Sequence, residues 1–141
     1  MKNMPDDNSI DTALLATQLT VTLETNGIDA MFQKLEDSLR DSRRWHSLFD
    51  ARLLRARATL GLPLIGPVTD ADKAIKKKLD EETIAACREV GWQLLSEGQI
   101  TSGWMYLRAA VDTHEVVEKL NQMAIQLLEE EESANGDEEY Q

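Results

Sequence analysis

The chain has 141 residues, of which 42% are hydrophobic and only 5% aromatic, and it carries a formal net charge of −11 at pH 7. This length suits one domain, and the low aromatic content favours a helical interior built from Leu and Ala over a β-sandwich. The negative charge repels phosphate groups, so we expect no binding to nucleic acid or to anionic membranes.

The single cysteine, Cys87, excludes an internal disulfide and fits a reducing compartment. The chain does not open on a charged and then apolar leader. No apolar run approaches the ~18 residues that a membrane span needs. We therefore expect a cytoplasmic protein with no membrane segment.

The N-terminal segment is polar at first and then apolar. Residues 1–8 are expected to form a disordered tail. Ser9 can cap a helix from Ile10 to about Glu24 that ends at Gly27. The Thr and Val residues in this segment lower its helix propensity, so a strand is the alternative.

Two apolar stripes with helical spacing predict a first hairpin over residues 28–60. The first stripe consists of Ile28, Met31, Phe32, Leu35 and Leu39. The second begins at Trp45 and ends at Leu60, just before Gly61. Ser42 lies in the expected turn and could cap the second helix of this hairpin.

Residues 61–69 hold two prolines and several apolar side chains, which predicts an ordered linker. Thr69 and Asp72 resemble a capping box that would begin the next helix. Whether this helix continues to Glu97 stays open, because the acids at 80–82 could instead form a first helical turn of their own.

Residues 84–114 organise the chain as a second, central hairpin. Its helices are expected over residues 84–97 and 101–111, with Gly98 in the left-handed turn between them. Small residues occupy the positions where the two backbones should meet: Gly91, Gly103 and Ala110. Glycine is costly in an exposed helix, so we expect these residues to permit close packing.

This hairpin resembles one tetratricopeptide repeat, a motif that spaces large and small residues over 34 positions. The matching positions are Cys87, Val90, Gly91, Leu94, Gly98, Gly103, Leu107 and Ala110. The sequence departs from the motif at Cys87, Leu94 and Glu115, where the motif has Trp, Tyr and Pro. The resembling repeat spans about residues 84–117 of the 141-residue chain.

The resemblance implies that the first helix of the pair lines a ligand-facing groove. The groove positions of the motif fall on Ala85, Arg88, Trp92, Leu95 and Ser96. Arg88 and Trp92 are four residues apart and so share one helical face, where they could offer a cation and an aromatic surface. The alternative places Trp92 in the core beneath Arg88. The predicted partner-binding residues are Arg88, Trp92, Leu95 and Ser96.

The C-terminal segment repeats the helical spacing once more. Its stripe consists of Val116, Leu120, Met123 and Leu127. We expect a capping helix over residues 114–130. Residues 129–141 hold seven acids and no base, so residues 131–141 are expected to be a disordered acidic tail.

Candidate catalytic and metal-binding groups are few. His46, His114 and Cys87 are the only soft ligands in the chain, and Cys87 falls in the core pattern of the central hairpin. We expect no catalytic site, no metal site and no cofactor.

One basic cluster stands out from the acidic background. It contains six of the fifteen Lys and Arg residues, namely Arg40, Arg43, Arg44, Arg52, Arg55 and Arg57. We expect these arginines to pair with acids of neighbouring helices. The alternative is a docking patch for an acidic segment, conceivably the acidic tail of this protein.

Together these patterns predict an all-α fold of antiparallel helical hairpins, stacked as a right-handed array like tetratricopeptide repeats or as a compact bundle. The expected parts of the single domain at 9–130 are the hairpin 28–60, the linker 61–69, the hairpin 70–113 and the capping helix 114–130. We expect a non-enzymatic module that binds a protein or peptide segment. The alternatives are a self-associating subunit or fragment of a larger repeat protein, and an acidic nucleic-acid mimic that binds a basic protein.

Overall fold

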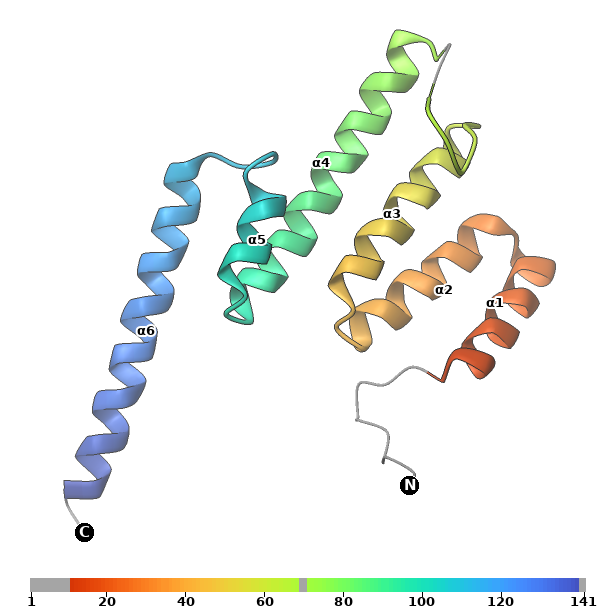
Figure 1. The fold of residues 1–141 in the computed structure, drawn as a ribbon. Coiled ribbons are helices and arrows are strands. Elements are labelled where there is room, and N and C mark those ends of the chain that lie inside the picture. The colour runs from red at the N-terminus through yellow and green to blue at the C-terminus, as the bar shows by residue number, and fades with distance from the viewer. Residues whose placement is uncertain (1–10, 69–70, 140–141) are drawn as a thin grey trace.

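The computed structural model describes residues 11–68 and 71–139, and these two ranges contain six α-helices and no strand (Figure 1). The helices are α1 (Thr12–Asn26), α2 (Ile28–Asp41), α3 (Trp45–Thr59), α4 (Lys73–Ser96), α5 (Ile100–Leu107) and α6 (Thr113–Glu139). From α1 to α5 each helix packs against the next one in the chain. The all-α prediction is confirmed.

The central helix α4 is one unbroken segment of 24 residues. Asp72 caps it, because its carboxylate accepts a hydrogen bond of 2.8 Å from the Ala74 amide. Thr69, the other half of the expected capping box, lies outside the described residues. The acids at 80–82 therefore lie within α4, and the question that the sequence left open is settled in favour of a single long helix.

Two hydrophobic clusters lie on opposite sides of the second half of α4. The first joins α2, α3 and α4 and consists of Leu39, Trp45, Leu48, Ala51, Val90 and Leu94. The second joins α4, α5 and α6 through Leu95, Leu107 and Val116, with Trp92, Trp104, Val111, Leu120 and Met123 packed against them. Because both clusters use α4, this helix links the N-terminal hairpin to the C-terminal helices.

Close contact between α4 and α5 depends on two glycines. A Cβ atom on Gly103 would lie 2.9 Å from the carbonyl oxygen of Gly91 and 3.0 Å from the amide nitrogen of Leu95. A Cβ on Gly91 would lie 2.6 Å from Cγ of Leu107. Gly98 forms the turn with a φ of +84°. The expected helix approach at Gly91 and Gly103 is confirmed, whereas Ala110 lies beyond the end of α5.

The first hairpin forms as expected from α2 and α3. Ser42 does not cap α3; its hydroxyl donates a hydrogen bond of 2.8 Å to the Ser38 carbonyl and so closes the end of α2. Arg43 takes a left-handed φ of +56° in this turn. The reason is local: the Ser42 hydroxyl lies within reach of the Ser38 and Leu39 carbonyl groups in the last turn of α2 and donates to them instead of accepting from the first amides of α3.

Residues 12–26 form a helix and not the alternative strand. Asp11 caps α1 by accepting a hydrogen bond from the Leu14 amide at 3.1 Å, and Ser9 lies outside the described residues, as does the expected tail at 1–8. The hydroxyl groups of Thr17, Thr20 and Thr22 donate to carbonyl groups four residues earlier in the helix. No side chain of α1 is buried.

The last helix is longer than expected. α6 continues to Glu139 and so includes most of residues 131–141, which we expected to be disordered. Glutamate is a good helix former, so the acidic run at 129–132 extends α6 although its charges repel one another. The acidic charge therefore lies along an ordered helix as far as the side chains are described.

The linker between α3 and α4 is held in place by hydrogen bonds from the Arg57 side chain to backbone carbonyl groups of the linker. Arg57 donates hydrogen bonds to the carbonyl groups of Pro63 at 3.0 Å and Gly66 at 2.8 Å. Ile65, in contrast, is 89% exposed. The linker is ordered through polar contacts, and not through the apolar packing that the sequence led us to expect.

The glycine contact predicts an unusual response to mutation. An ordinary helical Gly→Ala change stabilises a protein by up to ~1 kcal/mol, but Gly103→Ala should lower the free energy of unfolding by about 1–3 kcal/mol, because its Cβ would meet backbone atoms that cannot move aside. Urea unfolding followed by circular dichroism measures this change. The matched control is Thr101→Ala on the exposed side of α5, which should change stability by less than about 0.5 kcal/mol.

Candidate functional site

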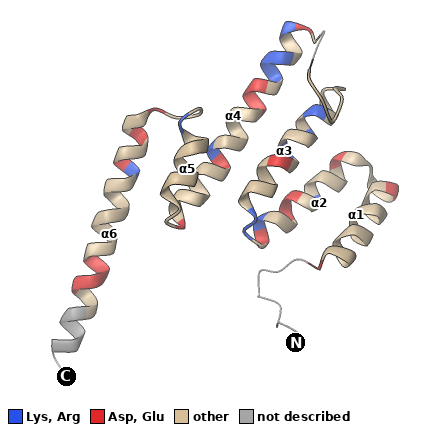
Figure 2. Cartoon of the chain, in the orientation of Figure 1, with Lys and Arg blue, Asp and Glu red and all other residues tan. Residues whose placement is uncertain are grey.

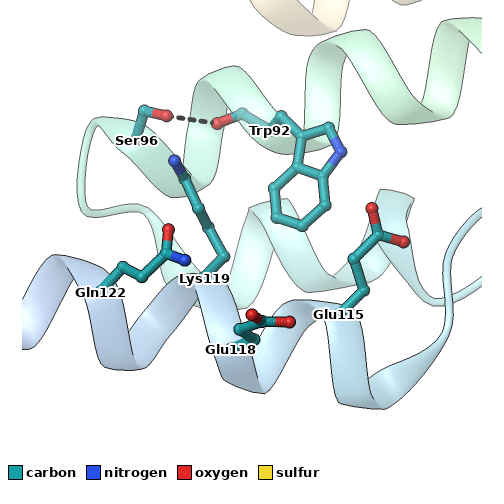
Figure 3. A pocket seen from close by; sticks show the side chains of 6 residues that line it. All are labelled: Trp92, Ser96, Glu115, Glu118, Lys119 and Gln122. Atoms are coloured by element: carbon teal, nitrogen blue, oxygen red, sulfur yellow. Dashed lines mark hydrogen bonds between the residues drawn. The ribbon is translucent and has the colours of Figure 1, made fainter.

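A groove of about 480 Å³ lies between the second half of α4 and the beginning of α6 (Figure 3). Its lining residues are Trp92, Ser96, Glu115, Glu118, Lys119 and Gln122. Helix α6 packs on the α4 and α5 pair along the stripe of Val116, Leu120 and Met123, and the groove lies beside this stripe. The neighbouring face of α6 is left beside α4 without side chains that fill the space.

Trp92 combines the two roles that the sequence left as alternatives. Its side chain is half-buried and packs on the cluster around Leu95 and Leu107. It also points from α4 toward α6 and lines the groove (Figure 3). Trp45, by comparison, is buried and donates a hydrogen bond of 3.0 Å to Glu97. Trp92 is thus the indole that remains open to the groove.

Arg88 lies one helical turn before Trp92, at the end of the groove. Its guanidinium donates a hydrogen bond of 3.2 Å to the carboxylate of Glu115 on α6. Both side chains are nearly half exposed, so the free energy gained from this pair is small. The pair connects α4 to α6 at the point where the groove begins.

The remaining predicted site residues differ in placement. Ser96 lines the groove, and its hydroxyl donates to the Trp92 carbonyl at 2.8 Å (Figure 3). Leu95 is only 1% exposed and belongs to the second core cluster, so it cannot contact a partner. Its place on the helix explains this correction: Leu95 faces α5, where the glycine contact brings the two helices together. Ala85 is half-buried and does not line this groove.

The sequence analysis missed the α6 side of the groove. Glu115, Glu118, Lys119 and Gln122 supply this wall. They follow the helical spacing i, i+3, i+4 and i+7, parallel to the apolar stripe of the same helix. The helical spacing of these polar residues could therefore have predicted the second wall, but the repeat motif assigns groove positions only to the first helix of the hairpin.

The groove continues toward the end of α6. A second hollow of about 440 Å³ shares Ser96 and Lys119 with the first. Its other lining residues are Glu97, Gly98, Met123, Gln126, Leu127 and Glu130. Leu127 is 63% exposed, so the apolar stripe of α6 extends into this part of the groove without being covered.

Four of the six arginines in the cluster at residues 40–57 form ion pairs with acids, as expected, namely Arg40, Arg43, Arg52 and Arg55. Arg57 donates to linker carbonyl groups instead, and Arg44 forms no ion pair among the described residues. Glu89 on α4 accepts hydrogen bonds from Arg40 on α2 at 2.8 Å and from Arg52 on α3 at 2.9 Å. Glu36 is only 3% exposed and accepts from Arg55 at 3.0 Å and from Arg40 at 3.3 Å. These contacts use the charges that a docking patch would need.

The arginines also change the acidity of their partners. Hydrogen bonds from Arg40 are the main reason why the pKa of Glu89 lies below its ordinary value, with Arg52 adding to the effect. A hydrogen bond and the charge of Arg55 likewise lower the pKa of Asp29. Both carboxylates are therefore held in the charged form.

Other reactive groups lie away from the groove. Cys87 is buried, and this burial raises the pKa of its thiol. His46 is exposed, and its Nδ1 lies 2.7 Å from the Tyr106 hydroxyl. Among the residues that the structure describes, no group of three or more His, Cys, Asp and Glu could hold a metal ion. Within the same ranges, no helix has both the length and the apolar character that crossing a membrane would require.

Comparisons of the chain with protein families, with curated proteins and with solved structures found no match. The resemblance to a tetratricopeptide repeat therefore stays a prediction, which rests on the residues of the central hairpin.

The carboxylate that joins three helices gives a prediction for stability. Glu89→Gln should lower the free energy of unfolding at pH 7 by about 1–2 kcal/mol, because two arginines lose a charged acceptor at a partly exposed site. Glu81→Gln, an exposed position on the same helix, is the matched control.

The same variant predicts a pH dependence. Because the pKa of Glu89 is lower in the folded than in the unfolded chain, its stabilising effect is complete above the ordinary Glu pKa of about 4.3 and is lost as the pH falls through the folded value. Denaturant unfolding between neutral and acidic pH should therefore show a smaller loss of stability for Glu89→Gln than for the unmodified chain. Equal losses in both proteins would show that Glu89 is not linked to folding in this way.

Proposed function

We propose that this chain is a non-enzymatic interaction module that binds a protein or peptide segment in the groove between α4 and α6. The observation that carries the proposal is the half-buried indole of Trp92, which forms part of the wall of an open groove instead of being covered by α6. Tryptophan is enriched among residues that dominate binding energy, since it offers a large rigid apolar area.

The groove also has the mixed lining that segment recognition needs. Trp92, Met123 and Leu127 supply apolar surface. Lys119, Gln122 and Gln126 can form hydrogen bonds that orient a bound chain. The two hollows share Ser96 and Lys119 and so form an extended site, which suits a segment of chain better than a compact small molecule.

The repeat resemblance supports the same location. In that motif the first helix of the pair faces the ligand, and α4 carries Arg88, Trp92 and Ser96 at the corresponding positions. The predicted wall is therefore combined here with a second wall from α6. We propose a cytoplasmic location for this module, because its one cysteine is a buried free thiol.

A second candidate function is self-association through α1. Leu14, Val21 and Leu23 on this helix are 54%, 55% and 43% exposed. Terminal units of helical arrays need polar outer faces to stay apart, and α1 carries a single charged side chain, Glu24. A second copy of the chain could cover this face.

Binding to the groove can be tested by capture of partners from cells that contain the protein. Trp92→Ala should lower the amount of the captured partner at least tenfold, because truncating an aromatic anchor costs ~2 kcal/mol or more. Quantitative mass spectrometry measures the captured proteins. Met105→Ala, at an exposed position on α5 outside the groove, is the matched control and should retain the partner.

A second variant separates binding from folding, since Trp92 also contacts the core. Ser96→Trp places a large side chain into the groove from an exposed position and removes no core contact. It should abolish capture while the circular dichroism spectrum stays that of the unmodified chain. Unchanged capture by both variants would refute the groove as the binding site.

Self-association predicts a sedimentation coefficient that rises with protein concentration over roughly a hundredfold range. The double variant Leu14→Gln and Val21→Gln should remove this rise, because both side chains share one exposed face of α1. Ile65→Gln alters an equally exposed apolar side chain in the linker and serves as control. Identical profiles for the double variant and the unmodified chain would exclude α1 as the interface.

A further inference from the structure

The charges around the groove are strongly unequal, and they indicate the chemistry of its occupant. Four carboxylates line its two hollows, namely Glu97, Glu115, Glu118 and Glu130, and the one cationic side chain in this lining is Lys119. Two of these carboxylates already have partners, because Glu115 pairs with Arg88, and Glu97 accepts a hydrogen bond from Trp45 and lies 3.8 Å from Arg43. Glu118 and Glu130 form no ion pair among the described residues and remain open to a cationic partner. We propose, as an extension of the function proposed above, that the groove binds a basic amphipathic segment of a partner protein.

The apolar part of this segment is set by the stripe of α6. At the start of the stripe Val116 is 4% exposed and packs on α4 and α5, whereas Leu127 near its end is 63% exposed. Leu128 is 61% exposed beside it. The stripe thus leaves the core in mid-helix, and a partner with its own apolar face can continue the packing that α4 and α5 begin.

The basic part of the segment is set by carboxylates at both ends of the groove. Glu115 and Glu118 lie at one end, and Glu97 and Glu130 lie at the other. On α6, Glu115 and Glu130 are fifteen residues and so about 22 Å apart along the helix axis. A bound helix of about four turns spans this distance and can place Lys or Arg side chains near Glu118 at one end and Glu130 at the other.

A second copy of this chain fits the groove less well. Pairing of α6 with α6 would bring together two helices whose acids outnumber their bases (Figure 2). The apolar helix α1 carries only Glu24, so it offers no cation to the groove carboxylates. An acidic segment would be repelled. Charge complementarity therefore favours a basic partner.

The direct test uses labelled synthetic helices as probes. The first is an eighteen-residue peptide with Leu at helical spacing i, i+4, i+7 and i+11 and Lys on the other faces. The second replaces each Lys by Glu, and the third keeps the Lys composition but scrambles the order of residues. In fluorescence anisotropy titrations the first should bind at least tenfold more tightly than either of the others, and its affinity should fall as salt is raised.

Charge-reversal variants locate the contact. Glu118→Lys combined with Glu130→Lys should weaken binding of the lysine peptide at least tenfold, because each change removes an attraction and adds a repulsion at opposite ends of the groove. Asp80→Lys combined with Glu81→Lys is the matched control. It makes the same change in net charge at exposed positions on the first half of α4, and it should weaken binding less than about twofold.

Four results would overturn the inference. Equal binding of the acidic or the scrambled peptide would show that basic, amphipathic character is not recognised, and equal weakening by both double variants would show attraction by net charge alone. A concentration-dependent dimer that Ser96→Trp abolishes would assign the groove to a second copy. If none of the peptides binds but capture of a cellular partner still depends on Trp92, the interaction module stands and the basic partner is refuted.

Discussion

The contact between the backbones of Gly91 and Gly103 is the constraint on which this architecture depends. It lets the short helix α5 lie directly on α4. It also places Leu107 of α5 in the cluster that joins α4 to α6. Without that approach, Leu95 and Leu107 would not meet, and Val116 would have no apolar surface on which to hold α6. The side chains in the second half of α4 thereby contact both the hairpin of α2 and α3 and the C-terminal helices α5 and α6.

The groove is a consequence of how α6 is attached. The first part of α6 packs on the hydrophobic core, and the pair of Arg88 and Glu115 makes a further, weak contact with α4 at one end. The remainder of the 27-residue helix extends beyond the body of the protein (Figure 1). Because α6 is attached near its beginning and does not cover Trp92, one of its faces forms an open wall of the groove. The proposed segment would lie against this wall.

The sequence predicted the helical class, the hairpin at residues 28–60 and the glycine contact, because apolar spacing and small residues act locally or between neighbouring helices. It placed Trp92 and Ser96 at the groove, but it could not exclude Leu95. A helical face has no sharp boundary in sequence, and the position of α5 decides which residues become buried. The α6 wall depends on how α6 attaches to α4 and α5, which the repeat pattern does not specify. The extent of α6 to Glu139 depends on the helix propensity of glutamate, whereas the prediction of a disordered tail rested on its charge.

The ion pairs of the arginine cluster influence how net charge is distributed over the helices. Arg40, Arg52 and Arg55 are matched by carboxylates on α2 and α4, so the region of α2 and α3 carries little uncompensated negative charge. Along α6, in contrast, acids outnumber bases: Lys119 is the one Lys or Arg residue, against Glu115, Glu118 and the run at 129–132 (Figure 2). The excess of negative charge along α6 would attract an approaching cationic molecule toward this helix before any contact forms. Diffusional encounters would then begin preferentially at the end of the protein that carries the groove.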